Sequence, residues 1–308
     1  MTSNQFHANS VVRLSSERAI RFTTPLKLVG QPPLGYTQLE TYYDAKHQVA
    51  WYYMNGQPRP CFTPTLLAEL DRWYNEVAER AIPEADEPVR YLVAASKVPR
   101  VFNLGGDLDL FQRLIRQRDR QGLRAYARAC IGPLYRNMVS LERDLTTISL
   151  VQGDALGGGF EAALSSNVVI AERSARMGLP EVLFNLFPGM GAYSFLSRRV
   201  GPALAERIIL SGRLYTAEEL NAMGVVDVVA DDGDGEMAVY RYIEQERRAQ
   251  NAYRAIRAVR QVVTPVTREE LARVAEIWVD AALRLEHRDL RKMDRLVARQ
   301  NHKAVSYV

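Results

Sequence analysis

The sequence predicts an α/β fold, and three observations support this prediction. Apolar runs of strand length end in glycine-rich turns, and apolar residues at helical spacing follow these turns. The composition is that of a globular protein, because 47% of the 308 residues are apolar and 25% are charged. Two successive strand-to-helix passages place the functional loops of such a domain at the ends of its strands.

Three elements open the predicted core. Residues 49–54 are rich in β-formers, and an Asn-Gly pair after them is a turn signal. Residues 62–81 carry leucine, tryptophan and valine at helical spacing, with Thr63 as the expected N-cap. Residues 89–95 form a short apolar run, which predicts a buried strand.

The same order of strand, loop and helix then recurs. A loop is expected over residues 96–106, followed by a helix from Asp107 and a further amphipathic stretch to about Arg143. Residues 146–151 predict a second buried strand, which ends in a run of glycines. A short helix follows that run, and residues 168–171 predict another strand.

The chain divides into three predicted regions. Residues 1–35 contain several prolines and weak periodicity, so they are interpreted as an N-terminal arm. Residues 36–236 form the predicted catalytic core, and the polar loop 231–236 marks its boundary. Residues 237–308 are predicted to be helical, with a strong apolar stripe over residues 271–285.

Charge and rare residues exclude several classes of protein. Forty Lys and Arg against 36 Asp and Glu leave a net charge of +4, which is too small a surplus to indicate nucleic-acid binding. Two cysteines without C-x-x-C spacing and four scattered histidines predict no metal site and no disulfide scaffold. No secretory signal and no bilayer-spanning apolar run are visible. The sequence therefore predicts a cytoplasmic protein that binds neither membrane nor metal.

Three glycine-rich segments are the candidate ligand sites, namely residues 102–108, 157–161 and 177–181. Glycine allows close approach of the backbone to a ligand, and a helix N-terminus exposes unpaired N–H groups. Two such junctions side by side can direct two N–H donors at one oxygen, which is the design of an oxyanion hole. Glu161 and Glu181 lie in these segments. The parts suffice for acid–base chemistry beside a polarised carbonyl.

Each of these features alone also has an ordinary structural explanation. A Gly-Gly junction is usually a tight turn, and a glutamate in the first turn of a helix usually interacts with the helix dipole or caps it. Their occurrence together and in this order favours the functional interpretation.

A dinucleotide site is the main rival interpretation of the second segment. Residues 157–162 satisfy G-x-G-x-x-[GA], and Glu181 follows about 20 residues later. The stretch 160–167 is short for a Rossmann crossover helix, and Glu181 follows a Gly-Leu-Pro turn instead of ending a strand. Neither a P-loop nor a G-x-S-x-G elbow is present. No nucleotide cofactor is therefore predicted.

The order of motifs resembles the crotonase (enoyl-CoA hydratase/isomerase) superfamily over roughly residues 47–300. The motifs are Phe-x-x-Gly-Gly-Asp at 102–107, Gly-Gly-Gly-Phe-Glu at 157–161, Gly-x-Pro-Glu at 178–181 and Pro-Gly-x-Gly at 188–191. Within the superfamily the chain looks most like the bacterial diffusible-signal-factor synthases. The resemblance implies a spiral of ββα units with a C-terminal helical oligomerisation segment, and no cofactor.

The resemblance also implies roles for particular residues. Glu161 and Glu181 match the family's glutamate pair, and Gly106 and Gly158 match its two backbone donors. Trp278 matches a tryptophan that lines the acyl pocket. Glu181 is expected to remove the proton at C2, while Glu161 protonates the departing 3-hydroxyl. The other expected substrate-binding residues are Leu156, Gly157, Phe160, Met190 and Phe195.

The implied substrate is a 3-hydroxyacyl thioester on acyl carrier protein, or on CoA. The implied product is a free cis-2-unsaturated fatty acid that serves as a quorum-sensing signal, made by dehydration followed by thioester hydrolysis. A conventional enoyl-CoA hydratase or isomerase and a non-catalytic crotonase-like binding protein remain alternatives. The N-terminal arm departs from the family pattern, which leaves the pocket entrance and any regulatory protein partner open.

A basic stretch from Phe111 to Arg136 is a candidate docking surface for the carrier protein. It contains one acid, Asp119, and seven arginines: Arg113, Arg116, Arg118, Arg120, Arg124, Arg128 and Arg136. A solvated helix face or an inter-subunit contact explains the same charges. The resemblance further implies a homo-oligomer, a trimer or a multiple of three, formed through the C-terminal helices.

Overall fold

Two β-sheets organise the part of the chain that the computed structural model describes, which is residues 35–56, 59–82, 85 and 88–305. The larger sheet has six strands in the order β1-β2-β3-β5-β7-β10, and its strands are parallel apart from the antiparallel pair β1 and β2. These strands are β1 (Leu39–Asp44), β2 (Val49–Met54), β3 (Tyr91–Ser96), β5 (Thr146–Val151), β7 (Val168–Glu172) and β10 (Val228–Ala230).

The smaller sheet has four strands in the order β4-β6-β8-β9, of which β8 and β9 are antiparallel. They are β4 (Val101–Asn103), β6 (Asp154–Leu156), β8 (Arg176–Gly178) and β9 (Leu214–Thr216). Successive turns of the chain place one strand in each sheet and then a helix: β3 and β4 precede α2, β5 and β6 precede α4, and β7 and β8 precede the 3-10 helix η2. This confirms the predicted crotonase-like spiral of ββα units.

The helices of these turns lie beside the small sheet and carry the loops of interest. They are α2 (Leu108–Arg116), α3 (Arg120–Met138), α4 (Gly158–Leu164), η2 (Pro180–Phe184), α5 (Ala192–Val200), α6 (Pro202–Ser211) and α7 (Ala217–Ala222). Helix α1 (Pro64–Arg80) precedes them and packs against α3. Its N-cap is Thr63, whose side chain accepts from the amide of Leu66, as the sequence predicts.

The central strands are buried on both faces, which is why they appear in the sequence as uninterrupted apolar runs. Trp51 and Val93 face α8 (Gly235–Arg248), whereas Tyr52 and Leu92 face the core beneath α1 and α3. Helix α8 packs against β5 and β7. The C-terminal region predicted from residue 237 therefore begins inside a helix that covers the large sheet.

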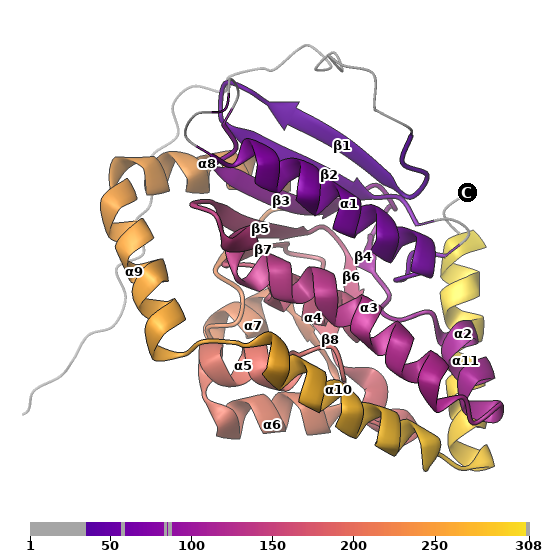
Figure 1. The fold of residues 1–308 in the computed structure, drawn as a ribbon. Helices are drawn as coiled ribbons and strands as arrows, with labels where there is room; N and C mark the ends of the chain where they lie inside the picture. Colours follow the sequence, from indigo (N-terminus) through magenta and orange to yellow (C-terminus); the bar gives the residue numbers. More distant parts are fainter. Residues whose placement is uncertain (1–34, 57–58, 83–84, 86–87, 306–308) are drawn as a thin grey trace, which may run out of the picture. The chain divides into compact units, whose positions relative to one another are not determined.

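Three further helices complete the described chain: α9 (Gln250–Val263), α10 (Arg268–Leu283) and α11 (His287–Val305). Figure 1 shows α10 running along α3, and the two helices are in contact. Helix α11 contacts α2 and η2. None of the described helices is long and apolar enough to cross a membrane.

The predicted elements differ from the structure in the shortest strands. The expected loop 96–106 contains β4, and β6, β8 and β9 were also not predicted, because a three-residue strand shows no periodicity. Strand β1 was missed as well, since the prediction began at β2. The predicted arm, residues 1–35, lies outside the described residues except for Gly35.

Candidate active site

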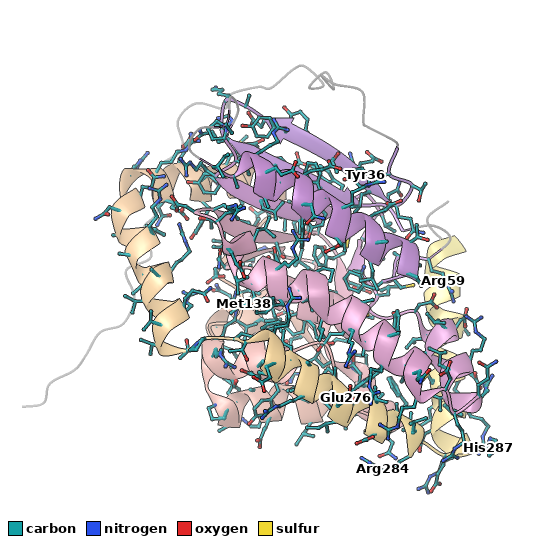
Figure 2. All side chains as sticks on the ribbon, in the orientation of Figure 1. Tyr36, Arg59, Met138, Glu276, Arg284 and His287 are labelled. Atoms are coloured by element: carbon teal, nitrogen blue, oxygen red, sulfur yellow. The ribbon has the colours of Figure 1, made fainter. Side chains whose placement is uncertain are left out.

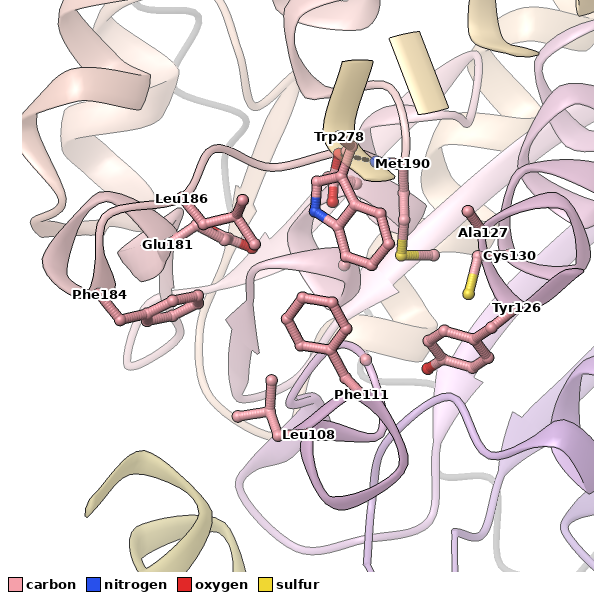
Figure 3. Close-up of a pocket in the computed structure, with 14 residues that line it drawn as sticks. Leu108, Phe111, Tyr126, Ala127, Cys130, Glu181, Phe184, Leu186, Met190 and Trp278 are labelled. Atoms are coloured by element: carbon pink, nitrogen blue, oxygen red, sulfur yellow. Dashed lines mark hydrogen bonds between the residues drawn. The ribbon is translucent and has the colours of Figure 1, made fainter. Parts of the chain in front are cut away.

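Two chambers meet where the small sheet joins the helices that follow it. The inner chamber is lined mostly by buried residues (Figure 3): Gly106, Leu108, Phe111, Tyr126, Ala127, Cys130, Gly158, Glu161, Glu181, Phe184, Leu186, Gly189, Met190 and Trp278. The outer chamber is bounded by the half-exposed Leu183 and Leu214. Both chambers share Gly106, Leu108, Gly158, Glu181 and Phe184. Predicted donors and a predicted carboxyl therefore lie at their junction.

Glu161 is held by the beginning of α5. It lies in the first turn of α4 and is 1% exposed. Its Oε1 accepts hydrogen bonds from the backbone amides of Met190 at 2.8 Å and Ala192 at 2.9 Å. The amides at the start of a helix have no acceptor within the helix, so this carboxylate satisfies donors that would otherwise be unpaired.

Glu181 has no comparable support. It follows Pro180 in η2, and its Oε1 lies against Gly157, where an added Cβ would collide with that oxygen. Gly157 also has a φ of +52°, so both its conformation and its neighbour require glycine. The Oε2 of Glu181 is buried and has no hydrogen-bond partner among the described residues. This oxygen is therefore free to meet a ligand in the chamber.

The two carboxyls differ in their affinity for a proton. Burial raises the pKa of both, because the charged form is poorly solvated inside the protein. The backbone donors from Ala192 and Met190 partly counteract this effect at Glu161. The negative charge of Glu161 raises the pKa of Glu181 further. The backbone donors therefore favour the charged form of Glu161, and that charge disfavours the charged form of Glu181.

The backbone amides of Gly106 and Gly158 belong to residues that line both chambers. Gly158 is the first residue of α4, so its N–H has no acceptor within that helix. The loops that carry Gly106 and Gly158 touch: a Cβ on Gly105 would lie 3.0 Å from the Gly158 nitrogen, and a Cβ on Gly158 would lie 3.4 Å from the Gly106 nitrogen. Two N–H groups at this spacing can donate to one oxygen.

Two aromatic rings close one side of the inner chamber. Trp278 of α10 stacks on Phe111 of α2, with ring centroids 4.7 Å apart and planes at 22°, as Figure 3 shows. The indole also lies directly against Gly189, where a side chain would clash with it. The wall thus joins α2, α10 and the loop before α5.

Ion pairs involve five of the seven arginines in the basic stretch, and three of these arginines hold α10 along α3. Arg124 binds Glu276 through two hydrogen bonds of 2.6 and 2.8 Å, and Figure 2 labels Glu276 on α10. Arg120 pairs with Asp280 on the same helix. The other pairs among the described residues are Arg116 with Asp294, Arg128 with Glu276 and Arg136 with Asp71. Much of this charge is therefore compensated within the chain.

The structure brings together most of the predicted site residues. Glu161, Glu181, Gly106, Gly158, Met190 and Trp278 line the inner chamber. Leu156 and Gly157 line the outer chamber.

Two predicted residues lie elsewhere. Phe160 is fully buried in the core, and Phe195 packs against Gly191 beside a different cavity. Phe160 precedes Glu161 by one residue on α4, and about 100° of helical rotation separates their side chains. In the structure Glu161 lines the chamber and Phe160 packs in the core.

Several lining residues were not found from the sequence. Phe111, Tyr126, Ala127 and Cys130 come from α2 and α3, whose apolar positions carry no signal that separates a cavity wall from a core. The described residues contain no group of three or more His, Cys, Asp or Glu side chains placed to hold a metal ion. The candidate chemical groups of the site are therefore two carboxyls and two backbone amides around an apolar cavity.

Comparison with known proteins bears on the family of this chain. Residues 59–295 match the family model described as enoyl-CoA hydratase/isomerase. Mitochondrial methylglutaconyl-CoA hydratase of Mus musculus is 31% identical over 163 residues, which is 51% of this chain and 48% of that protein. The chain thus spans about half the length of the curated relatives it matches.

Solved structures share the fold. Human mitochondrial delta3-delta2-enoyl-CoA isomerase superimposes with a TM-score of 0.72 at 19% identity, covering 87% of this chain and 99% of that chain. DspI of Pseudomonas aeruginosa superimposes with a TM-score of 0.57 at 24% identity, covering 82% of this chain and 98% of that chain. The family model covers well over half of the sequence and the folds agree, so the chain belongs to the enoyl-CoA hydratase/isomerase family.

Proposed function

We propose that the protein removes and adds water at C2 and C3 of an acyl thioester, with Glu161 and Glu181 as its acid–base pair. The observation that carries this proposal is the convergence of both carboxyls and the residues of both donor amides, Gly106 and Gly158, on one chamber. The Oε2 of Glu181 is buried there without a partner among the described residues. A carboxyl left in this state is typical of a catalytic group.

The amides of Gly106 and Gly158 form the oxyanion hole in this proposal. Removal of the C2 proton places negative charge on the thioester oxygen, and two N–H donors stabilise that charge. Each donor contributes about 3 kcal/mol in comparable sites. This stabilisation lowers the energy of the enolate, so a carboxylate is a strong enough base to remove the C2 proton.

Dehydration requires one proton to be correctly placed at the start. Glu181 accepts the C2 proton while Glu161 donates its proton to the 3-hydroxyl, which leaves as water. The backbone donors to Glu161 favour its charged form, which is the form that the reverse reaction, the addition of water, needs. Burial also raises the pKa of Glu161. The state with the proton on Glu161 is therefore within reach, and both directions are open.

The finer proposal is that dehydration is followed by hydrolysis of the same thioester. After dehydration Glu161 is a carboxylate and Glu181 is protonated. Glu161 takes a proton from water as the oxygen attacks the thioester carbonyl, the C–S bond breaks, and the thiolate takes the proton of Glu181. Glu161 is then protonated again and Glu181 is again a carboxylate, which is the state that dehydration needs. Because both steps together restore the starting protonation of the pair, they support the release of a free cis-2-enoic acid.

The resemblance to diffusible-signal-factor synthases supports a 3-hydroxyacyl group on acyl carrier protein as the substrate and a quorum-sensing role for the product. Trp278 lies on the inner chamber, where the resemblance expects the acyl chain. Within the basic stretch, Arg113 and Arg118 are exposed and form no ion pair with the described residues. We propose these two arginines as the carrier-protein contact, because the remaining arginines are already paired.

A conventional enoyl-CoA hydratase is the second candidate. The curated hydratase that this chain matches favours this candidate. In that case the thioester remains intact. A non-catalytic binding protein is disfavoured, because burying two carboxyls destabilises a protein that makes no use of them.

Mass spectrometry of the product separates these candidates. The purified protein is incubated with one 3-hydroxyacyl group carried either on acyl carrier protein or on CoA. A free cis-2-enoic acid that is absent with Glu161→Gln is the expected result. Enoyl thioester without free acid would instead establish the conventional hydratase. No conversion of either substrate would leave the proposed chemistry without support.

A further inference from the structure

The hydroxyl of Tyr126 lies between two chain segments that meet beside Gly106. Tyr126 belongs to α3, and its hydroxyl donates to the carbonyl oxygen of Phe62 at 2.8 Å. The same oxygen accepts from the backbone amide of Asp107 at 2.7 Å. The hydroxyl therefore makes both of its strong hydrogen bonds to backbone groups, one on each segment.

These two segments form a short parallel pairing that the hydroxyl completes. Phe62 and Gly106 make an isolated parallel bridge, in which the amide of Phe62 donates to the carbonyl of Gly105 at 2.7 Å. In a regular parallel ladder the amide of Asp107 would then donate to the carbonyl of Phe62. The hydroxyl of Tyr126 is inserted at this position and receives the first bond while it donates the second.

The inserted hydroxyl lies beside Gly106, the central residue of this pairing. In such a pairing the flanking residues bond to the partner segment, so the amide of the central residue points away from it. The central residue here is Gly106, which lines both chambers. A Cβ on Gly106 would meet the Tyr126 hydroxyl at 3.3 Å, so the phenol lies against this peptide. Tyr126 thus supports the Gly106 amide from behind.

The support is permanent under ordinary conditions. Tyr126 is 8% exposed, and burial raises the pKa of its hydroxyl well above the usual range, so the donor proton is retained. Asp107 is fixed independently, because its side chain caps α2 by accepting from Leu110 and pairs with Arg59. The N–H of Gly106 belongs to the same planar peptide as the carbonyl of Gly105, which accepts from Phe62. The direction of that N–H therefore follows the pairing of the two segments, and the hydroxyl bonds to both of them.

We propose that Tyr126 is a positioning residue that orients the Gly106 amide toward the thioester oxygen. This inference rests on the proposed function, in which Gly106 donates to the oxyanion. Tyr126 touches no reacting atom in this role, and it acts by fixing the main chain.

Tyr126→Phe tests the inference, because it removes the hydroxyl and keeps the ring. We expect kcat for an enoyl thioester to fall about tenfold while KM changes less than about twofold, since a misdirected donor weakens binding of the transition state more than that of the substrate. A conjugated dienoyl thioester should also show a smaller red shift of its absorbance on binding, because its carbonyl is less polarised. Tyr52→Phe is the matched control, since it removes another buried hydroxyl, bonded to Tyr74 at 2.9 Å, away from both chambers.

A second variant changes the other partner of the contact between Tyr126 and Gly106. Gly106→Ala places a methyl group against the hydroxyl, so it should also lower kcat, and this result holds even where Tyr126→Phe fails to fold. The double variant removes the atom that the methyl meets, so its loss should be smaller than the product of the two single losses. Multiplicative losses would contradict a shared contact.

The outcomes separate the inference from the proposed function. Turnover by the wild-type protein that disappears in Glu181→Gln supports the proposed function on its own. With that turnover present, wild-type kcat and red shift in Tyr126→Phe would overturn the role of Tyr126 alone. A wild-type protein that converts no enoyl or 3-hydroxyacyl thioester would overturn both.

Discussion

The acids buried near α8 and the acids of the inner chamber differ in what neutralises them. Glu246 is 2% exposed, and it accepts from the Thr146 hydroxyl at 2.8 Å and pairs with Arg257 at 3.0 Å. Asp44 binds His47 at 2.6 Å and accepts from Tyr240. In the chamber, Glu161 has only backbone donors, and the Oε2 of Glu181 has no partner among the described residues.

This difference separates structural acids from reactive ones. A buried carboxylate with a cation and a hydroxyl donor keeps its charge and ties two elements together. A buried carboxyl without a cation takes up a proton more readily, which is the property that acid–base catalysis needs. Unlike Glu246, neither chamber carboxyl pairs with a cation of the described residues, and the following predictions test that contrast.

The largest expected effect is on catalysis. Glu181→Gln and Glu161→Gln should each lower kcat on the order of 10³-fold, because each removes one partner of the proton exchange. Glu246→Gln is the matched control, an equally conservative change at a buried acid outside the chamber. Steady-state rates with the thioester identified as substrate measure the effect. Near-normal rates in both chamber variants would remove the proposed roles.

The second expected effect is on stability, and it concerns the structural acid Glu246. Glu246→Gln should lower the free energy of unfolding by about 2 kcal/mol, because it leaves Arg257 without its counter-ion. The loss is smaller than for a fully buried pair, since the side chain of Arg257 is 16% exposed. Urea unfolding measures it, with activity per folded molecule unchanged. A loss of activity greater than the loss of folded protein would contradict the structural role.

A third effect is the pH dependence of stability in Glu181→Gln. The pKa of Glu181 is raised from 4.5 to about 8 in the folded protein, so the folded state binds more protons than the unfolded state between these values. Wild-type stability therefore falls as the pH rises through this window, whereas glutamine does not titrate.

The stability of the variant relative to wild type should accordingly rise with pH, by on the order of 4 kcal/mol between pH 5 and pH 9. Thermal unfolding at both pH values measures it. A relative stability that does not rise between these pH values would show that Glu181 is neutralised by a contact.

The smallest effect concerns the two stacked aromatic pairs among the described residues. Trp278→Leu removes part of the chamber wall, so kcat/KM for longer acyl chains should rise about fivefold relative to shorter ones. Trp51→Phe changes the other stack, formed with Tyr53 beneath α8 at 5.6 Å between centroids, and should leave the preference unchanged. A set of thioesters of increasing chain length measures both. An unchanged preference in Trp278→Leu would place the acyl chain elsewhere.

Long elements could be predicted because each carries its own pattern. The bounds of β2 and β5 agree with the predicted strands, and α1 begins after the predicted cap Thr63. The strands of the small sheet could not be predicted, since three residues contain less than two full periods of alternation. These strands exist because the neighbouring turns of the spiral supply their hydrogen bonds.

The candidate site divides in the same way. Glu161, Glu181 and the glycine junctions were found because glycines and carboxyls in this order are unusual in a plain turn. Phe160 and Phe195 were expected at the cavity and lie outside it, because apolarity predicts burial without predicting direction. Phe111 and Tyr126 were missed for the same reason.

The amino-acid sequence by itself determined the α/β class and the long strands and helices, and it predicted the two carboxyls and two glycines of the candidate site, since these depend on local pattern and residue chemistry. Only the tertiary structure decided that Met190 and Ala192 donate to Glu161, that Glu181 is left without a partner among the described residues, and that α3 places the Tyr126 hydroxyl behind Gly106. These contacts join residues that are far apart along the chain. Local pattern cannot encode such distances, and the proton affinities of the pair follow from them.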